Sequence, residues 1–483
     1  MKIIQIVSNY MRGDAVSKVA DTIEKSIRSI GVETEMLSGL LTEELVESGI
    51  FNDDTIILYH LSVRMDPFLQ YVNCKKVLVF HNITTPELLI GFNIESLRID
   101  CEAGLYELSK TVECFDYAIA FSDYSRNTLI EQGWNDDKII TLPIIVKFDE
   151  LSGESSNHII DRFSDGKKNF TFFGRLFPNK KQEDIIRCFE RYKRKYNANS
   201  RLILVGSGKA PKYEMLLKKL VEDLDICDDV VFTGFVTQEE YISYYKISDC
   251  FICMSEHEGF CIPLVEAMYF DVPIIAYSST AIPSTLEGAG ILLDSKDPDV
   301  VSDYMNKVIT EKEYRDKIIE GQRKRLEHLK LDTLGSEYTK AIKKITEKPY
   351  VKDDKLDSEK HIYFGQSIFS MTVPKCIEKS GDPIVIYGMG KWGKQLCYNF
   401  SVSPLSNRKV LCDSNCSDGD YNGYDIKSFE EAIHFNADAY WIVTPEKKET
   451  AIQMIVILIN KRVPLSRIAT YDGYLNIISM IEG

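Results

Sequence analysis

Residues 258–266 read EGFCIPLVE and set two carboxylates, Glu258 and Glu266, eight positions apart around a glycine turn and a proline. Proline is well tolerated in the first turn of a helix, so a helix is predicted to begin near Ile262. The turn at 259–261 then presents backbone N–H groups ahead of that helix. Such a terminus attracts phosphate, and the layout predicts a site that binds a sugar on one side and a ribose on the other.

The sequence around this stretch indicates a strand, a loop, a helix and a second strand. Upstream, residues 250–254 (CFICM) form an apolar run of strand length, and downstream the predicted helix leads through Pro273 into the apolar run 274–276. Strands and helices also alternate in the first 150 residues, with apolar runs at 55–60, 77–81 and 117–122. This alternation predicts parallel, doubly wound α/β sheets.

The stretch 258–266 resembles the signature of retaining glycosyltransferases of the GT-B fold, a family that takes sugars from nucleotide diphosphates. Four other segments agree with this resemblance, namely 77–82 (VLVFHN), 171–181 (TFFGRLFPNKK), 202–208 (LILVGSG) and 230–236 (VVFTGFV). The resemblance extends to about residue 345, which is enough for two domains of ordinary size. It implies two Rossmann-like doubly wound domains that face a cleft.

The resemblance also implies a role for each matching residue. Arg175 and Lys181 would hold the donor diphosphate, Glu258 would bind the sugar hydroxyls, and His81 would face the sugar from across the cleft. Glu266 would bind the ribose, because a carboxylate accepts two hydrogen bonds from a vicinal diol. The predicted catalytic residues are therefore Glu258, His81, Arg175 and Lys181. The predicted donor-binding residues are Glu266, Gly259, Phe260, Cys261, Ile262, Leu264, Gly206, Phe235 and Gly13.

Alternatives stay open at several of these positions. His81 is followed by residues 82–86 (NITTP), which can form a self-satisfied turn around a merely structural histidine. Gly13 stands where the family often has two or three glycines, and an ordinary turn capped by Asp14 fits as well. Cys261 and Gln182 occupy positions where the family commonly has glycine.

The C-terminal part carries a pattern that the two-domain family does not require. Residues 388–393 (GMGKWG) follow an apolar run at 383–387, and Asp413 ends another run twenty residues past Gly393. This context predicts a small Rossmann-like domain with a nucleotide loop made by Gly388, Gly390, Gly393 and Asp413. A docking or dimerisation module that keeps its glycines for close packing is the alternative. The predicted domains are 1–155 on the acceptor side, 156–348 on the donor side, a linker at 349–380, and 381–483.

Composition and charge exclude several classes of protein. The formal net charge is −15, and residues 1–150 hold 13 basic and 24 acidic side chains, the wrong sign for broad nucleic-acid binding. The sequence contains no apolar run of membrane-spanning length, so a soluble, cytoplasmic protein is expected. The 12 cysteines are expected to be buried and reduced. Cys250 and Cys253 would point to opposite faces of a strand, so no metal site is predicted.

We therefore expect a retaining hexosyltransferase that uses a nucleotide diphosphate sugar and requires no cofactor. The segment 81–87 (HNITTPE) resembles members linked to O-antigen and capsule synthesis, which tilts the donor toward GDP-mannose, with UDP-hexoses as competitors. The acceptor would be a saccharide or a lipid-linked saccharide, with at most peripheral membrane contact at the inner face. Self-association through the C-terminal domain is an open expectation. A nucleotide-sugar epimerase and a non-catalytic scaffold subunit of a glycan-assembly complex are the alternatives.

Overall fold

The computed structural model describes most of the chain. The described residues are 1–347 apart from 9, 11–14, 67–68 and 70–71, and then 383–388, 409–413, 419–421, 424–435, 439–444, 448–461, 463 and 468–470. They group into two compact units, of which the first comprises Met1–Val63, Asn73–Ile94 and Phe115–Tyr350. The second comprises Arg64–Val72, Glu95–Cys114 and the described part of Val351–Gly483. Gly13, Gly390, Gly393 and the predicted linker lie outside the described residues.

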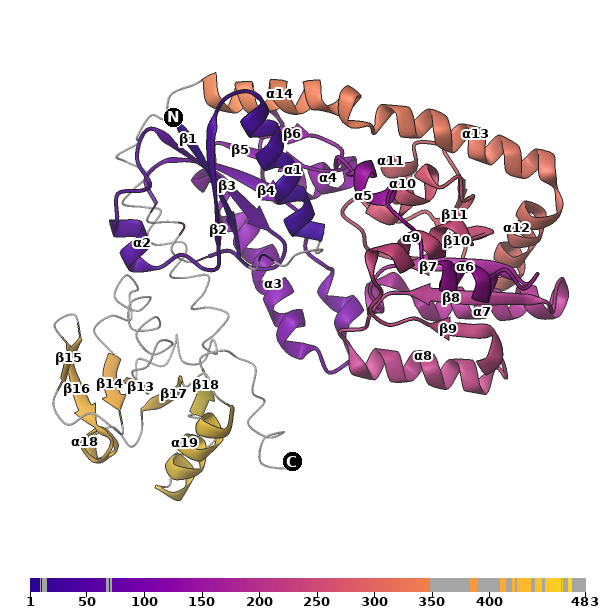
Figure 1. Ribbon diagram of the computed structural model, residues 1–483. Coiled ribbons are helices and arrows are strands. Elements are labelled where there is room, and N and C mark those ends of the chain that lie inside the picture. Colours follow the sequence, from indigo (N-terminus) through magenta and orange to yellow (C-terminus); the bar gives the residue numbers. More distant parts are fainter. Residues whose placement is uncertain are drawn as a thin grey trace. The chain divides into compact units, whose positions relative to one another are not determined.

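The first sheet of the first unit has six parallel strands in the order β2-β1-β3-β4-β5-β6 (Figure 1). The strands are β1 (Lys2–Val7), β2 (Glu33–Ser38), β3 (Thr55–Leu61), β4 (Lys75–Phe80), β5 (Tyr117–Ala120) and β6 (Ile139–Thr141). Every residue of β3 and β4 is buried. A strand covered on both faces reads as a continuous apolar run, which is why the sequence indicated a parallel sheet here.

The second sheet of this unit is also wholly parallel, in the order β12-β11-β10-β7-β8-β9. Its strands are β7 (Lys168–Phe173), β8 (Ser200–Val205), β9 (Val230–Phe232), β10 (Cys250–Cys253), β11 (Ile274–Tyr277) and β12 (Ile291–Leu293). The strand, loop, helix and strand predicted around residues 258–266 are β10, a loop, α10 (Ile262–Tyr269) and β11. The predicted helix start at Ile262 is confirmed, with Pro263 in the first turn.

Helices connect the strands of both sheets. They are α1 (Ala15–Ser29), α2 (Glu43–Glu47), α4 (Asp123–Glu131), α5 (Phe148–Leu151), α6 (Asn157–Phe163), α7 (Gln182–Lys195), α8 (Pro211–Asp223), α9 (Gln238–Lys246), α11 (Ile282–Leu286), α12 (Pro298–Thr310), α13 (Lys312–His328) and α14 (Leu331–Glu347). Short 3₁₀ turns are η2 (Pro86–Leu89), η4 (Asp136–Lys138), η5 (Pro178–Lys180) and η6 (Cys227–Asp229).

Helix α14 follows the second sheet in the sequence but packs against the first half of the unit (Figure 1). The Tyr338 hydroxyl donates to the Pro143 carbonyl at 2.9 Å, and the Lys75 ammonium donates to the Ile345 carbonyl. Tyr338, Ile342 and Ile345 are buried. This last helix therefore ties the two sheets of the unit together.

The second unit contains a third sheet in the order β15-β16-β14-β13-β17-β18, parallel except for the β15–β16 pair. Its elements are α3 (Glu95–Lys110), η3 (Val112–Cys114), β13 (Ile384–Tyr387), β14 (Lys409–Asp413), β15 (Gly419–Tyr421), β16 (Tyr424–Ser428), α18 (Phe429–Phe435), β17 (Tyr440–Val443), α19 (Lys448–Asn460) and β18 (Ile468–Thr470). Trp441 and Tyr387 lie in its apolar core. Gly388 follows β13 with φ 103°, and Asp413 ends β14.

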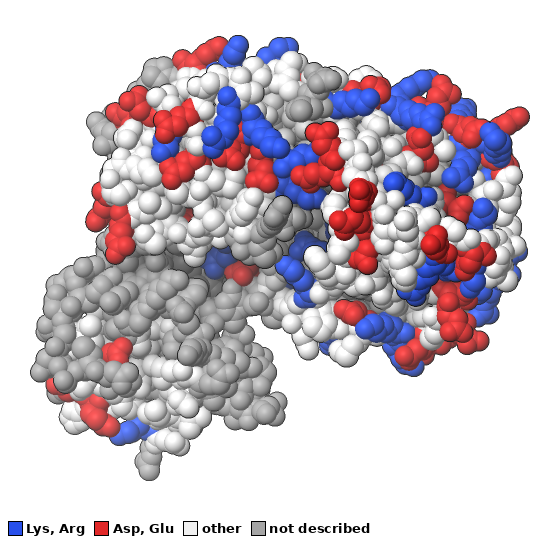
Figure 2. Space-filling model, viewed as in Figure 1, with Lys and Arg blue, Asp and Glu red and all other residues white. Residues whose placement is uncertain are grey.

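Two surface properties bear on function. Acidic and basic side chains of the described residues are interspersed over the face shown in Figure 2. Such a mixed surface does not resemble the one-sided basic face that nucleic-acid binding needs. Among the described helices, none is both long and apolar enough to cross a membrane.

Candidate active site

A cavity of about 420 Å³ lies in the first unit and is lined from both of its sheets. His81 and Asn82 follow β4, Gly174 and Arg175 follow β7, and the 258–266 stretch follows β10. Ligands of open α/β sheets bind at the carboxyl ends of parallel strands, because loops from several strands meet there. Of the predicted residues, the cavity brings together His81, Arg175, Glu258, Gly259, Phe260, Cys261, Ile262 and Glu266.

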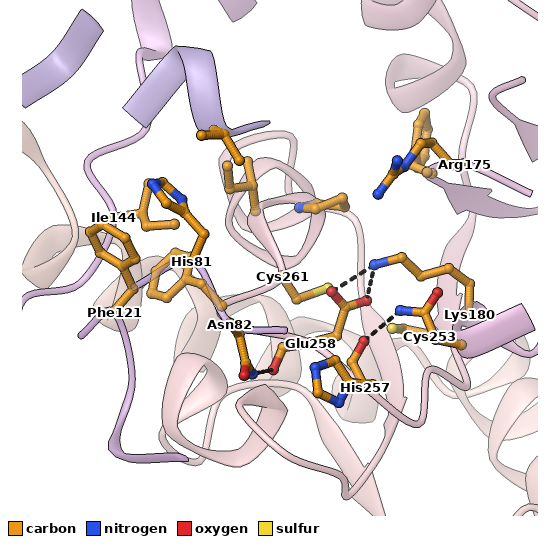
Figure 3. A pocket seen from close by; sticks show the side chains of 18 of the residues that line it. His81, Asn82, Phe121, Ile144, Arg175, Lys180, Cys253, His257, Glu258 and Cys261 are labelled. Carbon is orange, nitrogen blue, oxygen red and sulfur yellow. Dashed lines mark hydrogen bonds and ion pairs between the residues drawn. The ribbon is translucent and has the colours of Figure 1, made fainter. Parts of the chain in front are cut away.

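An ion pair holds the Glu258 carboxylate inside the cavity (Figure 3). The Lys180 ammonium donates to both of its oxygens, at 2.6 and 2.7 Å, and the Glu258 backbone N–H donates to Thr280 Oγ1 at 2.9 Å. Burial opposes the charged form of Lys180, but the attraction of Glu258 outweighs it, so the pKa of Lys180 is raised. The cavity therefore holds a charged Lys–Glu pair beside Arg175.

The structure places Lys180, rather than the predicted Lys181, in the cavity. Lys181 has φ 52° and ψ 46° at the start of α7, and its ammonium lies 3.4 Å from Glu256 and 3.6 Å from Glu183. Glycine adopts this left-handed conformation more readily than lysine does. The predicted diphosphate role of Lys181 stays a prediction, but the lysine that lines the cavity beside Arg175 is Lys180.

His81 is held by a chain of buried hydrogen bonds from the first sheet. Gln5 donates from Nε2 to the Ala20 carbonyl, so its Oε1 accepts from His60 Nε2 at 3.0 Å. His60 Nδ1 then has no proton and accepts from His81 Nε2 at 2.8 Å. Burial lowers the pKa of His81 to about 3, so the ring is neutral. Among the described residues nothing hydrogen-bonds its Nδ1, which can accept a hydrogen bond from a ligand.

The His81 loop and the Glu258 loop touch at Gly259. A Cβ at this residue would lie 2.8 Å from the His81 carbonyl oxygen and 3.1 Å from Asn82 Cβ. The Asn82 amide reaches the Glu258 carbonyl at 3.5 Å, and Thr85 Oγ1 bonds His257 Nδ1 at 2.9 Å. Glycine at 259 thus allows the loops of the two sheets to meet beside the cavity.

Cys261 caps α10 with φ 70° and ψ 68°, a backbone conformation that glycine adopts more readily. The residue is 7% exposed, and its Sγ lies within 4.8 Å of Sγ of Cys253, which ends β10. The interaction between the two thiols lowers the pKa of Cys253, whereas the same interaction and burial raise the pKa of Cys261. Both thiols line the cavity next to Glu258 (Figure 3).

Glu266 lies one helical turn beyond the start of α10 and is buried at the edge of the cavity. The hydroxyls of Tyr241 and Tyr245 both donate to its Oε2, at 2.7 and 3.0 Å. Burial first, and then the nearby carboxylate, raises the pKa of Tyr241 well above its ordinary value. Both tyrosines bind the same oxygen, and among the described residues none hydrogen-bonds Oε1, which can accept from a ligand.

Other predicted residues lie elsewhere. Leu264 is fully buried in the core behind the cavity, and Phe235 is 87% exposed, away from the cavity lining. Gly206 has φ 140° and packs on Gly174, where a Cβ would lie 2.1 Å from the Gly174 carbonyl oxygen. A glycine here lets the ends of β7 and β8 approach each other, and the predicted donor contact of Gly206 stays a prediction. Gly388 and Asp413 belong to the second unit.

Sequence reasoning missed three residues of the site, namely Lys180, Tyr241 and Tyr245. The tyrosines stand four positions apart on α9, a spacing that places them on one helix face. The spacing could have predicted that the two tyrosines lie together, but it could not have predicted that both bind Glu266. The contact between α9 and α10 depends on the tertiary fold.

Part of the chain is similar in sequence to known proteins. Residues 155–325 match the family model of glycosyl transferases group 1. The GDP-mannose-dependent alpha-(1-6)-phosphatidylinositol monomannoside mannosyltransferase of Mycobacterium tuberculosis is 28% identical over 29% of this chain. The O-antigen chain mannosyltransferase B of Escherichia coli is 22% identical over 43% of it. The matched regions span 37% and 55% of these two relatives.

Solved structures resemble a larger part of the chain. Anabaena HepE, solved in complex with UDP and glucose, matches over 71% of this chain and all of its own, with a TM-score of 0.56 and 16% identity. The sucrose-phosphate synthase of Thermosynechococcus elongatus matches over 71% of this chain and 98% of its own, with a TM-score of 0.58 and 13% identity. These likenesses and the two parallel sheets show a Rossmann-like GT-B fold, as predicted.

Proposed function

We propose that this protein is a retaining glycosyltransferase that moves a hexose from a nucleotide diphosphate sugar to a saccharide or lipid-linked saccharide in surface glycan synthesis. The observation that carries this proposal is the charged group of Arg175, Lys180 and Glu258 in a cavity faced by His81. The match of residues 155–325 to glycosyl transferases group 1 supports it.

The leaving diphosphate is the first requirement of this reaction. Breaking the bond between sugar and phosphate builds negative charge on the diphosphate, and cations fixed in place stabilise that charge. Arg175 and Lys180 line the same cavity, and the first turn of α10 adds backbone N–H donors and the positive end of a helix dipole. In this proposal these groups perform the work that a divalent metal does elsewhere, so no cofactor is required.

The sugar lies between Glu258 and His81 in this proposal. Glu258 accepts hydrogen bonds from the sugar hydroxyls once the diphosphate draws Lys180 away from it. His81 Nδ1, left unprotonated by the bond to His60, accepts from a hydroxyl on the other side. The acceptor attacks from the face that the diphosphate leaves, and the diphosphate takes its proton, so the anomeric configuration is retained without a covalent enzyme intermediate.

The ribose of the donor lies at Glu266. Two tyrosine hydroxyls fix Oε2 of this carboxylate, and Oε1 accepts from the ribose diol. The names of the relatives favour GDP-mannose as donor, since one is a GDP-mannose-dependent mannosyltransferase and another an O-antigen mannosyltransferase. A UDP-hexose is the competing donor, because Anabaena HepE was solved with UDP and glucose. We place the reaction in the cytoplasm, at or near the inner face of the membrane.

The test is donor turnover with GDP-mannose and UDP-glucose, with and without a saccharide acceptor, on the parent protein, Glu258→Gln and the matched control Glu256→Gln. We expect acceptor-dependent transfer with a retained anomeric configuration by NMR, lost in Glu258→Gln and kept in the control. An altered sugar released without acceptor would indicate the epimerase alternative. Absence of nucleotide binding and turnover in the parent protein would indicate the scaffold alternative.

A further inference from the structure

The cavity contains a second cluster with its own chemistry, made of Cys253, Cys261 and Glu258. Sγ of each cysteine and a carboxylate oxygen of Glu258 all lie within 4.8 Å of one another. All three residues are buried, with 1%, 7% and 8% of their surface exposed. Each also lines the cavity, so a small ion from solvent can reach the cluster. We propose that Cys253, Cys261 and Glu258 form a binding site for a thiophilic divalent cation such as Zn²⁺.

The spacing of the three ligand atoms fits such an ion. In a tetrahedral site, two sulfurs that each lie about 2.3 Å from Zn²⁺ are about 3.8 Å apart. This separation falls within the 4.8 Å that bounds all the ligand-atom distances in the cluster. Two thiolates and a carboxylate leave one coordination position open toward the cavity. Soft thiolate ligands favour Zn²⁺ over Mg²⁺ or Ca²⁺, which require oxygen ligands.

The positions of the cysteines in the fold explain why they meet. Cys253 ends β10, and the loop that follows returns the chain so that Cys261 caps the start of α10. The left-handed backbone of Cys261 is one that glycine adopts more readily, so cysteine is not required there by the turn itself. Cys250 stands on the same strand, and its thiol bonds the Phe251 carbonyl instead.

The charges around the cluster balance when the ion is bound. The two thiolates and Glu258 carry one more negative charge than Zn²⁺ neutralises, and the adjacent Lys180 ammonium balances it. Zn²⁺ must take one of the two Glu258 oxygens that Lys180 now binds at 2.6 and 2.7 Å. Metal binding therefore competes with the Lys180–Glu258 pair. If Glu258 binds the donor sugar as proposed above, the bound ion also blocks donor binding. Only this consequence rests on the proposed function.

The test measures Zn²⁺ bound to the full-length, reduced protein by equilibrium dialysis and needs no enzyme assay. The variants are Cys253→Ser and Cys261→Gly, with Cys250→Ser as the buried control on the same strand. We expect one Zn²⁺ fewer per chain in the first two variants and an unchanged number in the control. Cys261→Gly suits the left-handed backbone, so it keeps the test valid if Cys253→Ser does not fold.

A spectroscopic readout follows the ligands themselves. Co²⁺ bound through cysteine gives a thiolate-to-metal absorption band, which we expect to be weaker in Cys261→Gly than in the parent protein and in Cys250→Ser. Equal Zn²⁺ stoichiometry and equal Co²⁺ bands in the parent protein and Cys261→Gly would overturn the proposal. That result would leave the proposed glycosyl transfer untouched, since neither readout depends on it.

Discussion

The Lys180 ammonium lies 2.6 Å from one carboxylate oxygen of Glu258 and 2.7 Å from the other, while the neighbouring Lys181 turns away toward Glu256 and Glu183. Two consecutive lysines thus have different environments. Only Lys180 lines the cavity beside Arg175. This contrast offers a matched pair of variants for testing the proposed diphosphate site.

Lys180→Met and Lys181→Met each remove one positive charge and keep an unbranched side chain. Neither substitution introduces or removes a glycine, so the left-handed backbone at 181 costs about the same in both variants. For Lys180→Met we expect roughly a 100-fold loss of kcat, because it removes a fixed cation that stabilises the leaving diphosphate. Lys181→Met should lose less than about fivefold, since partly exposed ion pairs contribute at most about 1 kcal/mol. The measurement is steady-state donor turnover. Equal losses in both variants would refute the assignment to Lys180.

Much of the fold was predictable because central strands such as β3, β4, β8 and β10 are buried along their whole length. Runs such as 56–59 and 77–80 contain no charged residue, and Pro263 marks the helix start. The site was less predictable. Nothing local distinguishes Lys180 from Lys181, and the left-handed turn that separates them appears only in the structure.

Contacts between distant segments explain the remaining differences. Strand alternation correctly separates Cys250 from Cys253, but the approach of Cys261 to Cys253 depends on the loop between β10 and α10. The bonds of Tyr241 and Tyr245 to Glu266 join two helices 21 or more residues apart in sequence. Phe235 is 87% exposed, and its part in donor binding stays a prediction.

The hydrogen bond from Tyr245 to Glu266 predicts that removing the Tyr245 hydroxyl weakens donor binding more than it slows the transfer step. Tyr245→Phe removes one of the two hydroxyls that hold Glu266 Oε2. We expect the donor KM to rise roughly tenfold, because a hydrogen bond to a charged group contributes about 1.5 kcal/mol. The kcat should change little, since the ribose lies away from the reacting carbon. Tyr244→Phe on the same helix is the control, and a fall in kcat at constant KM in Tyr245→Phe would argue against ribose binding.

Gly259 predicts a stability effect at the junction of the two loops. In Gly259→Ala the new methyl group would lie 2.8 Å from the His81 carbonyl oxygen, so the loops must move apart. We expect the free energy of unfolding to fall by about 1–3 kcal/mol, as for other overpacked sites. Gly321→Ala is the control, because its Cβ meets nothing within 4 Å on α13 and should stabilise the helix by about 0.5–1 kcal/mol. Urea unfolding measures both, and an unchanged midpoint for Gly259→Ala would contradict the close approach.

The buried histidines predict how stability depends on pH. Burial lowers the pKa of His81 to about 3 and that of His257 to about 4, and it lowers the pKa of His60 well below its ordinary value. Because an unfolded histidine titrates near about 6.5, the unfolded chain binds more protons than the folded chain below that pH. Their contribution to stability is therefore present above about pH 6.5 and is lost as pH falls toward 4.

A single variant isolates one of these groups. His257→Gln removes the histidine whose pKa is about 4, and His328→Gln on the exposed surface of α13 is the control. As the pH is lowered from about 6 to about 4.5, each buried histidine that stays neutral in the folded chain lowers the free energy of unfolding by about 1.4 kcal/mol per pH unit. Urea midpoints across this range should therefore fall less steeply in His257→Gln than in the parent protein and the control. Identical slopes in all three proteins would mean that His257 titrates in the folded chain as it does in the unfolded one, and that its ring is not held neutral beside Glu258.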